Sequence, residues 1–199
     1  MPAHPGSRGT ARLRLEPVGP EHARDLWRLH QDAAVAAWHG GPWSMRDARR
    51  YAAAMAGLWA ADGAGKWVAY DRPGGELVGR GGLSRLAATS AVTGQIAALL
   101  AGQAWLADRL ELGWTVRAEL WGQGYATEIG QAGLDLAFGE LGAGRVVAFT
   151  ERHNRRSRAV MERLGMSYVG ELTAPGLVEG RAGVHDDAPF ALYVSAPGG

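Results

Sequence analysis

Apolar and polar residues alternate in several short runs of the chain, with the period of two that is typical of half-buried strands. The runs are Arg12–Glu16, Leu110–Val116 and Phe190–Val194. Two further strand-like runs, Lys66–Tyr70 and Glu76–Gly81, flank a turn that contains Pro and Gly. Because these residues supply turn geometry, the two runs predict a hairpin.

Helical spacing predicts two helices before most of this sheet. The first begins near Pro20, and its apolar positions are Leu26, Leu29 and Ala33. The second has Ser44 as its N-cap, with Asp47 three residues later, so that the two side chains can form a capping box. Its apolar stripe is Ala48, Tyr51, Ala52, Met55 and Trp59.

The second half of the chain follows the order strand, glycine-rich turn, helix, strand, helix, strand. Ile129–Ala137 carries the first helix face, Arg145–Thr150 is a buried strand, and Val160–Leu164 is the core side of the second helix. Gly165 is placed to end that helix, and Met166–Glu171 follows as a strand. The order predicts a mixed α/β sheet. Residues 87–108 lack a firm period, and we interpret them as an insertion of uncertain structure.

The composition narrows the class of protein. With 199 residues, 47% of them hydrophobic, we expect one domain over 11–199 after a flexible tail at 1–10. The formal charge of +1 argues against nucleic acid as the main partner. The chain has no cysteine, which excludes disulfides, thiolate metal sites and an acyl-enzyme on sulfur. No secretory signal or membrane-length apolar run is present, so we expect a cytoplasmic protein without metal or membrane partners.

The most informative segment runs from Val116 to Glu128, from a strand through a loop of small residues into a helix. Free backbone N–H groups at a helix start can hold a pyrophosphate, aided by the positive end of the helix dipole. Gly122, Gly124 and Ala126 keep side chains out of the way. A plain turn is the alternative. A P-loop is disfavoured because no Gly-Lys-Ser/Thr follows, and a Rossmann site because the segment comes late in the chain.

The sequence resembles the GNAT acetyltransferases, in particular the RimJ/RimL branch. The phosphate-binding motif of that family matches Trp121–Ala126, although Trp121 stands where Arg or Gln is expected. The form Trp-Gly-x-Gly-Tyr-Ala-Thr-Glu is similar to that branch, as are Glu111–Trp114 and Asn154–Met166. The resemblance covers most of the chain.

The resemblance implies a twisted, mostly antiparallel central sheet flanked by helices, whose fourth and fifth strands splay apart around acetyl-CoA. Trp114 and Val116 would line the pantetheine arm, and Asn154 would hydrogen-bond to it. The pyrophosphate would be held by the loop residues Trp121, Gly122, Gln123, Gly124, Tyr125 and Ala126.

Acetyl transfer needs a neutral amine, whereas a lysine-type ammonium has a pKa of about 10.4 and an α-amino group one of about 7.7–8.0. A base is therefore useful, and Glu111 is the first candidate because it stands near the start of the strand that would carry the thioester. The alternatives are Glu128, His185, which we place in a polar loop, or water. Relatives hydrogen-bond the leaving thiolate with a tyrosine whose place Met161 occupies here, so Ser157, one turn from Asn154, takes that role instead.

The function implied is N-acetylation of a small-molecule or peptide amine by direct attack in a ternary complex, with the protein a monomer or a homodimer. We expect residues 87–108 to border the acceptor site or a dimer contact. Some of the tryptophans should line the acceptor cleft, with core packing or a dimer surface as the alternative for each; those in the first third are Trp27, Trp38, Trp43, Trp59 and Trp67. Two alternatives stay open. One is a non-catalytic acetyl-CoA-binding module, and the other is a nucleotide-binding domain of another fold.

Overall fold

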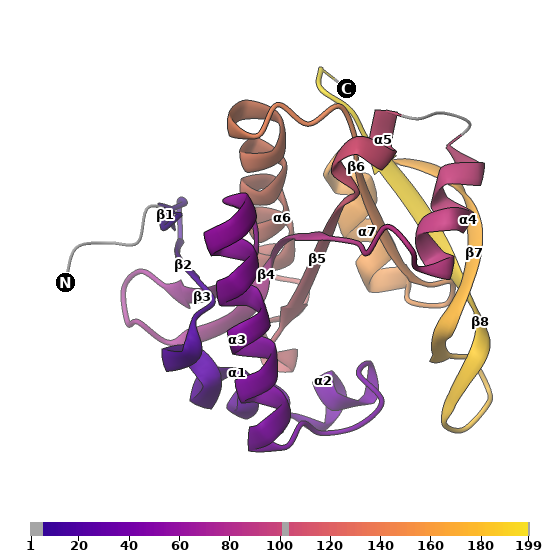
Figure 1. The fold of residues 1–199 in the computed structure, drawn as a ribbon. Coiled ribbons are helices and arrows are strands. Elements are labelled where there is room, and N and C mark those ends of the chain that lie inside the picture. The colour runs from indigo at the N-terminus through magenta and orange to yellow at the C-terminus, as the bar shows by residue number, and fades with distance from the viewer. Residues whose placement is uncertain (1–5, 101–103, 199) are drawn as a thin grey trace. The chain divides into compact units, whose positions relative to one another are not determined.

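The computed structural model describes residues 6–100 and 104–198, and groups them into two compact units. The first unit contains the residues up to Ser84 together with Trp114–Gly133, and the second contains Arg85–Gly113 together with the residues from Leu134 onward. Strand β5 (Leu110–Val116) and helix α6 (Tyr125–Asp135) each contribute residues to both units. Figure 1 shows the order of the elements along the chain.

Four consecutive antiparallel strands form the sheet of the first unit. They are β1 (Arg8–Gly9), β2 (Leu13–Pro17), β3 (Lys66–Asp71) and β4 (Leu77–Arg85). The predicted hairpin of β3 and β4 is confirmed. Although we expected a flexible tail as far as residue 10, Arg8 and Gly9 pair with Leu15 and Arg14 of β2.

Strand β4 runs very close to the second half of β5. The Arg117 N–H donates to the Val78 carbonyl over 3.0 Å. A Cβ on Gly79 would stand 2.2 Å from the Thr115 carbonyl oxygen. Only glycine therefore fits at position 79, because any side chain would push the two strands apart.

Three helices complete the first unit: α1 (Ala23–Leu29), α2 (Ala33–Ala37) and α3 (Met45–Asp62). The capping box is confirmed, since the Ser44 side chain accepts from the Asp47 N–H and Asp47 accepts from the Ser44 N–H. The first helix ends earlier than the pattern predicted, because Asp32 caps a separate helix that begins at Ala33. The core between α1, α3 and the sheet contains Val18, Leu26, Ala48, Ala52, Met55 and Val68.

The second unit is built on strands in the order β5-β6-β8-β7, with β6 at Val146–Glu151, β7 at Ser167–Leu177 and β8 at Val184–Ser195. The last two strands are longer than the alternation predicted. Strand β6 pairs antiparallel with β8 at six positions. Its parallel pairing with β5 has the single register position Glu111 opposite Val147 among the described residues. Such brief pairing is what strands that diverge from each other would give.

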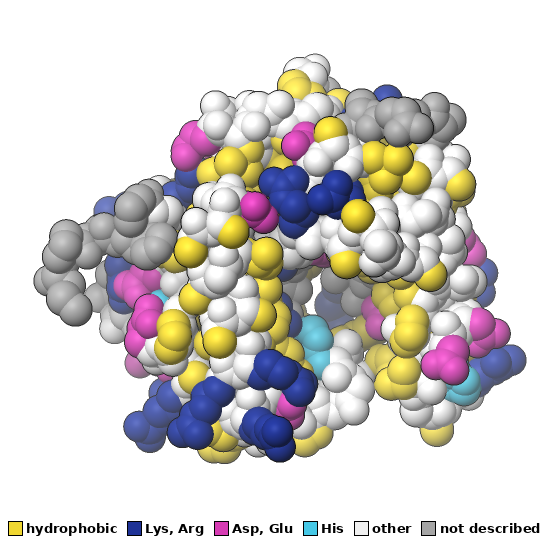
Figure 2. All heavy atoms as spheres, viewed as in Figure 1, with side chains coloured by type: hydrophobic (Ala, Val, Ile, Leu, Met, Phe, Trp, Pro, Cys, Tyr) yellow, Lys and Arg dark blue, Asp and Glu magenta, His cyan; other side chains and the backbone are white. Residues whose placement is uncertain are grey.

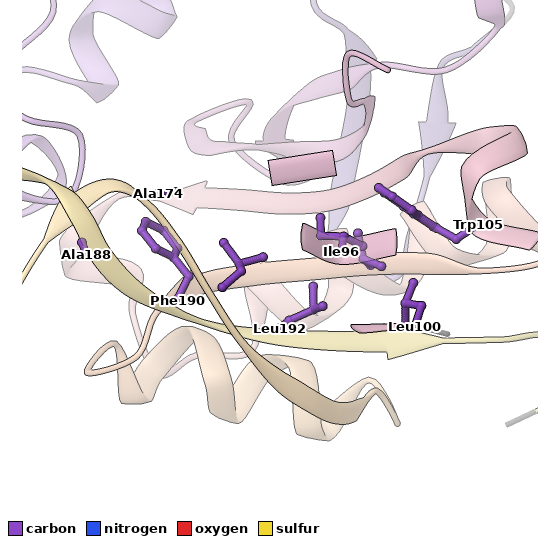
Figure 3. Packing of buried hydrophobic residues seen from close by; sticks show 9 residues of the cluster. Ile96, Leu100, Trp105, Ala174, Ala188, Phe190 and Leu192 are labelled. Carbon is purple, nitrogen blue, oxygen red and sulfur yellow. The ribbon is translucent and has the colours of Figure 1, made fainter. Parts of the chain in front are cut away.

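Helices cover both faces of this sheet. Residues 87–108, whose structure the sequence left uncertain, form α4 (Ala91–Leu99) and α5 (Ala104–Asp108). Ile96, Leu100 and Trp105 pack on Leu172, Phe190 and Leu192 in one apolar cluster (Figure 3). Helix α7 (Arg155–Arg163) lies on the opposite face, where Arg158 and Glu162 hydrogen-bond to the Tyr193 hydroxyl.

Helix α4 is therefore part of the core of the second unit. We expect Ile96→Ala to lower the free energy of unfolding by about 2–5 kcal/mol, because Ile96 is fully buried and its removal leaves a cavity. Denaturant unfolding measures this loss. Leu99→Ala, a half-buried position on the same helix, is the control and should cost less. Equal, small losses at both positions would contradict the core assignment.

Candidate functional site

The glycine-rich loop connects β5 to α6 within the first unit. A 3-10 turn at Ala118–Leu120 follows β5, and the loop then continues through Trp121 to the start of α6 at Tyr125. Gly122 and Gly124 have φ angles of 79° and 83°, in the left-handed region that favours glycine. Both residues are exposed, as is Gln123 between them, so the backbone of the loop is open to a ligand.

Most amide groups at the end of this loop are free to bind an anion, although the N–H groups of Trp121 and Gln123 donate to the Ala118 and Leu120 carbonyls. The N–H groups of Tyr125, Ala126 and Thr127, the first three of α6, donate to no acceptor in the part of the chain that the structure describes. The amides of Gly122 and Gly124 are likewise unused within those residues. Free donors at the positive end of a helix dipole form a phosphate-binding site. The geometry thus agrees with the role predicted for Gly122, Gly124 and Ala126.

Trp121 has a structural role that the motif comparison could not give. Its indole Nε1–H donates to the Val116 carbonyl over 2.8 Å, which ties the loop to the end of β5. Val116 itself is buried, whereas Trp114 is half-buried. The tryptophan at this position therefore holds the loop in place from the protein side.

Arg12, which the sequence analysis did not single out, reaches this loop from the start of β2. Its Nη1 donates to the Gln123 carbonyl over 2.9 Å, and its guanidinium lies 4.2 Å from the centre of the Tyr125 ring. A Cβ on Gly124 would stand 3.4 Å from its Nη2. Arg12 thus adds a positive charge beside the amides. No local pattern indicated this contact, because the residues that it joins are 111 positions apart in the sequence.

Glu128, one of the alternative bases, is held by the same strand. It accepts hydrogen bonds from the Thr10 hydroxyl at 2.5 Å, the Arg12 N–H at 2.8 Å and the Arg12 Nε at 2.7 Å. Partial burial pushes its pKa up, but the hydrogen bonds from Thr10 and Arg12 outweigh this effect and leave the pKa below its ordinary value. A carboxylate that is bonded in this way serves as an anchor for the start of α6.

The other predicted site residues belong to the second unit. Glu111 is half-buried on β5, opposite Val147 of β6. Asn154 is the N-cap of α7, and its Oδ1 accepts from the Ser157 N–H over 3.2 Å. The structure therefore places Asn154 and Ser157 on the first turn of one helix. Met161 is buried in the core, which accounts for an apolar residue at that place.

One expectation from the sequence is corrected here. His185 lies in strand β8 opposite Gly176 rather than in a loop, because β8 begins at Val184. Of the tryptophans, Trp59 and Trp67 are buried in the core and contact each other, so they cannot line a cleft. Trp43 is different, since it is half-buried and its ring stacks on the His30 ring, with the two ring centres 3.6 Å apart.

Basic side chains also gather away from the loop. Figure 2 shows basic side chains gathered over the start of α3, where Arg46, Arg49 and Arg50 are exposed. Arg50 is paired with Asp47 at 2.9 Å. The described residues contain no group of His, Asp and Glu side chains that could hold a metal ion. Among them, too, no helix has the length and apolar character that crossing a bilayer requires.

The acetyltransferase (GNAT) domain family matches residues 12–167. The chain belongs to the GNAT family. FsC-acetyl coenzyme A-N(2)-transacetylase of Aspergillus fumigatus is 32% identical to it over 180 residues, which cover 86% of this chain and 72% of that protein. As a member of this family, the protein is an acetyl-CoA-dependent N-acetyltransferase, and acetyl-CoA is its acetyl donor.

Solved structures confirm the GNAT fold. A GNAT-family acetyltransferase from Bordetella pertussis has a TM-score of 0.73 at 24% identity, with 96% of this chain and 99% of that chain covered. The ribosomal-protein-S5-alanine acetyltransferase from Vibrio fischeri has a TM-score of 0.71 at 14% identity, with 96% and 97% covered. At these identities the likeness concerns the fold alone.

The loop assignment predicts that Gly124→Glu weakens acetyl-CoA binding by about 100-fold or more, a loss of about 2.7 kcal/mol. The new carboxylate would compete with the pyrophosphate for the same amides. Calorimetric titration with acetyl-CoA measures the effect. Gly142→Glu is the matched control, since Gly142 also has a positive φ, at 63°, and is exposed in the second unit. Equal affinities in both variants would refute the assignment.

The lowered pKa of Glu128 makes its contribution to stability dependent on pH. A carboxyl whose pKa is lower in the folded state stabilises above its unfolded pKa and loses this effect as the pH falls through the folded value. Glu128→Gln should therefore lower the free energy of unfolding by about 2 kcal/mol at pH 7. The difference from the parent protein should shrink as the pH falls below 4.5, the ordinary pKa of a glutamate side chain.

Denaturant unfolding at several pH values tests this expectation. Glu179→Gln is the control, because Glu179 is exposed and no hydrogen bond or ion pair is recorded for it among the described residues. A loss at Glu128 that is the same at pH 7 and at pH 3 would show that packing, not charge, anchors α6.

Proposed function

We propose that the protein transfers the acetyl group of acetyl-CoA to a primary amine by direct attack in a ternary complex, without a covalent enzyme intermediate. The observation that carries this proposal is the loop between β5 and α6, with its unused amides at the start of α6. The absence of cysteine from the sequence also fits a mechanism without an acyl-thioenzyme.

A small-molecule amine is the acceptor that we propose first, with the α-amine of a protein N-terminus as the other candidate. The A. fumigatus relative is named as an N(2)-transacetylase and is 32% identical to this chain. This name supports transfer to an amine nitrogen. The acetyltransferase of ribosomal protein S5 supports the second acceptor less, because at 14% identity it shares only the fold.

In the proposed complex, the unused amides of Gly122, Gly124, Tyr125 and Ala126 bind the pyrophosphate, whereas the Trp121 and Gln123 N–H groups keep their bonds within the loop. Trp114 and Val116 line the pantetheine arm. Asn154 contributes its amide nitrogen to the pantetheine, since its Oδ1 already accepts the Ser157 N–H. Arg12 supports this site indirectly, because its guanidinium is paired with Glu128, holds the Gln123 carbonyl and stands next to Tyr125 at the start of α6.

The chemistry that we propose starts with loss of a proton from the ammonium of the acceptor to Glu111, directly or through a water. The neutral nitrogen then attacks the thioester carbonyl, and backbone N–H groups of β5 hydrogen-bond to the oxyanion. The C–S bond breaks as the attacking nitrogen loses its second proton, through a water, to the departing sulfur, so that CoA leaves as the thiol; Ser157 donates a hydrogen bond to this sulfur. Glu128 is not the base in this scheme, because its lone pairs are used by Thr10 and Arg12.

Thiol release from acetyl-CoA in the presence of an amine panel tests the proposed function. We expect turnover with at least one amine, and binding of acetyl-CoA in preference to ATP or NAD. Acetyl-CoA binding without turnover on small amines or N-terminal peptides would favour a non-catalytic module. Preference for ATP or NAD would contradict the assignment of the loop.

If Glu111 is the base, Glu111→Gln should reduce kcat/KM for the amine acceptor by about 10²- to 10⁴-fold. Its affinity for acetyl-CoA should stay unchanged. Ser157→Ala should lose about tenfold, because it removes one hydrogen bond to the sulfur. Steady-state kinetics and calorimetric titration with acetyl-CoA measure both effects. An unchanged kcat/KM in folded Glu111→Gln would assign the base to water or to another residue.

A further inference from the structure

A cluster of polar and aromatic side chains in the first unit is not used by the mechanism above. Its members come from the end of α1, the segment between α2 and α3, α3 itself and, further along the chain, β4. They are His30, His39, Trp43, Tyr51 and Arg80. His30 is fully buried and Arg80 is 8% exposed, whereas Trp43 and Tyr51 are half-buried and His39 is exposed. The cluster therefore extends from the interior to the surface.

Arg80 is a buried cation without an anionic partner. Its Nε donates to His30 Nε2 over 3.3 Å, and its Nη1 donates to the Tyr51 hydroxyl over 2.9 Å. The guanidinium also lies 5.3 Å from the Trp43 ring and 4.7 Å from the Tyr51 ring. No carboxylate pairs with it anywhere in residues 6–100 and 104–198. Buried charges are costly unless they are paired, so this arrangement calls for an explanation.

The two histidines do not balance this charge. Surrounding protein atoms, which keep water away from the rings, and then the positive charge of Arg80 lower the pKa of the buried His30 to about 2 and that of His39, whose ring is still partly open to solvent, to about 4. Both imidazoles are therefore neutral near pH 7, and the cluster carries the single positive charge of Arg80. His30 Nδ1 is also buried without a hydrogen-bond partner among the described residues. The cluster has unused capacity for an anion.

The cluster lies against the strand that we expect to carry the thioester. His39 Nε2 is 3.2 Å from the Thr115 hydroxyl, and Thr115 stands between Trp114 and Val116 on β5. Strand β4, which carries Arg80, also passes close to Thr115 at Gly79. A ligand bound to Arg80 would therefore stand beside the segment of β5 proposed to line the pantetheine arm.

We propose that Arg80 binds a carboxylate of the acceptor, so that the acceptors are amines that also carry a carboxylate group. This inference rests on the proposed function and specifies its substrate class. A guanidinium offers five N–H donors in a planar fork that matches a carboxylate, and the two hydrogen bonds to His30 and Tyr51 leave the rest unused. A monoanion fits a single cation better than a phosphate does. The rings of Trp43 and Tyr51 offer apolar walls for the carbon skeleton of the acceptor.

The decisive comparison uses L-amino acids, each beside its α-carboxamide, as acceptors with saturating acetyl-CoA. The carboxamide keeps the shape and removes the charge. We expect the parent protein to prefer the carboxylate by about 10- to 100-fold in kcat/KM, the value of a hydrogen bond to a charged group. Acetylation of both members of each pair at equal rates would overturn the proposal and leave the proposed function intact.

Variants locate the preference. Arg80→Gln should reduce the ratio to about one, and Arg80→Lys, which keeps the charge but not the fork, should give an intermediate ratio. Arg28→Gln is the matched control, because Arg28 is an exposed arginine of α1 in the same unit. The affinity of each variant for acetyl-CoA and its thermal midpoint show whether it is folded. A full preference that survives in folded Arg80→Gln would also overturn the proposal.

A binding measurement tests recognition of the carboxylate independently of turnover. Calorimetry with N-acetyl amino acids and their carboxamides, in the presence of CoA, asks only whether the carboxylate is recognised. Tighter binding of the carboxylate that depends on Arg80, in a protein that acetylates no amine, would support the site and refute the proposed function. Absence of any preference in both the kinetic and the binding assay would refute the site.

Discussion

The tie between Glu128 and the start of β2 is the contact on which the loop depends. A helix start offers amides to an anion only if the helix cannot shift along its axis. Thr10 and Arg12 hold the Glu128 carboxylate through one hydroxyl, one backbone N–H and one guanidinium nitrogen. The same guanidinium then binds the Gln123 carbonyl and stacks on Tyr125. One arginine thus fixes both the loop and the first turn of the helix, and the Trp121 indole fixes the other end of the loop on Val116.

Two arginines of the first unit show opposite electrostatic arrangements. Arg12 is paired with a carboxylate, its side chain is 44% exposed, and the pair organises backbone groups. Arg80 is buried, contacts only neutral groups and aromatic faces, and has no counter-ion in the described chain. A paired charge stabilises the fold with little left for a ligand, whereas an unpaired buried charge is costly until an anion arrives. This contrast is why Arg12 is a scaffold residue and Arg80 is the better candidate for recognition.

Local features of the site could be predicted from the sequence, because their partners lie within one turn of helix or one loop. The Ser44–Asp47 capping box, the end of α7 at Gly165 and the two left-handed glycines of the loop are of this kind. The structure of residues 87–108 could not be predicted from the sequence, because Ala, Gly and Leu occur on both sides of the helix and obscure its hydrophobic period. That α4 is a core helix follows from its contacts with Leu172 and Phe190, which no local pattern contains.

The contacts that could not be predicted are those between segments far apart in sequence. Arg12 meets Glu128 across 116 positions, and His39 meets Thr115 across 76. In the sequence, Arg80 is simply a polar residue in a hairpin strand, and only the fold reveals that it is buried with no carboxylate beside it. The resemblance to the GNAT family predicts the residues that bind acetyl-CoA, because the acetyltransferases of that family share this donor. Acceptors differ between members, so the acceptor site must be read from charges that this particular fold leaves unpaired. Arg80 is such a charge. Its cluster neighbour His39 and the adjacent Gly79 both lie against Thr115, which connects the cluster to the strand on which acetyl transfer would take place.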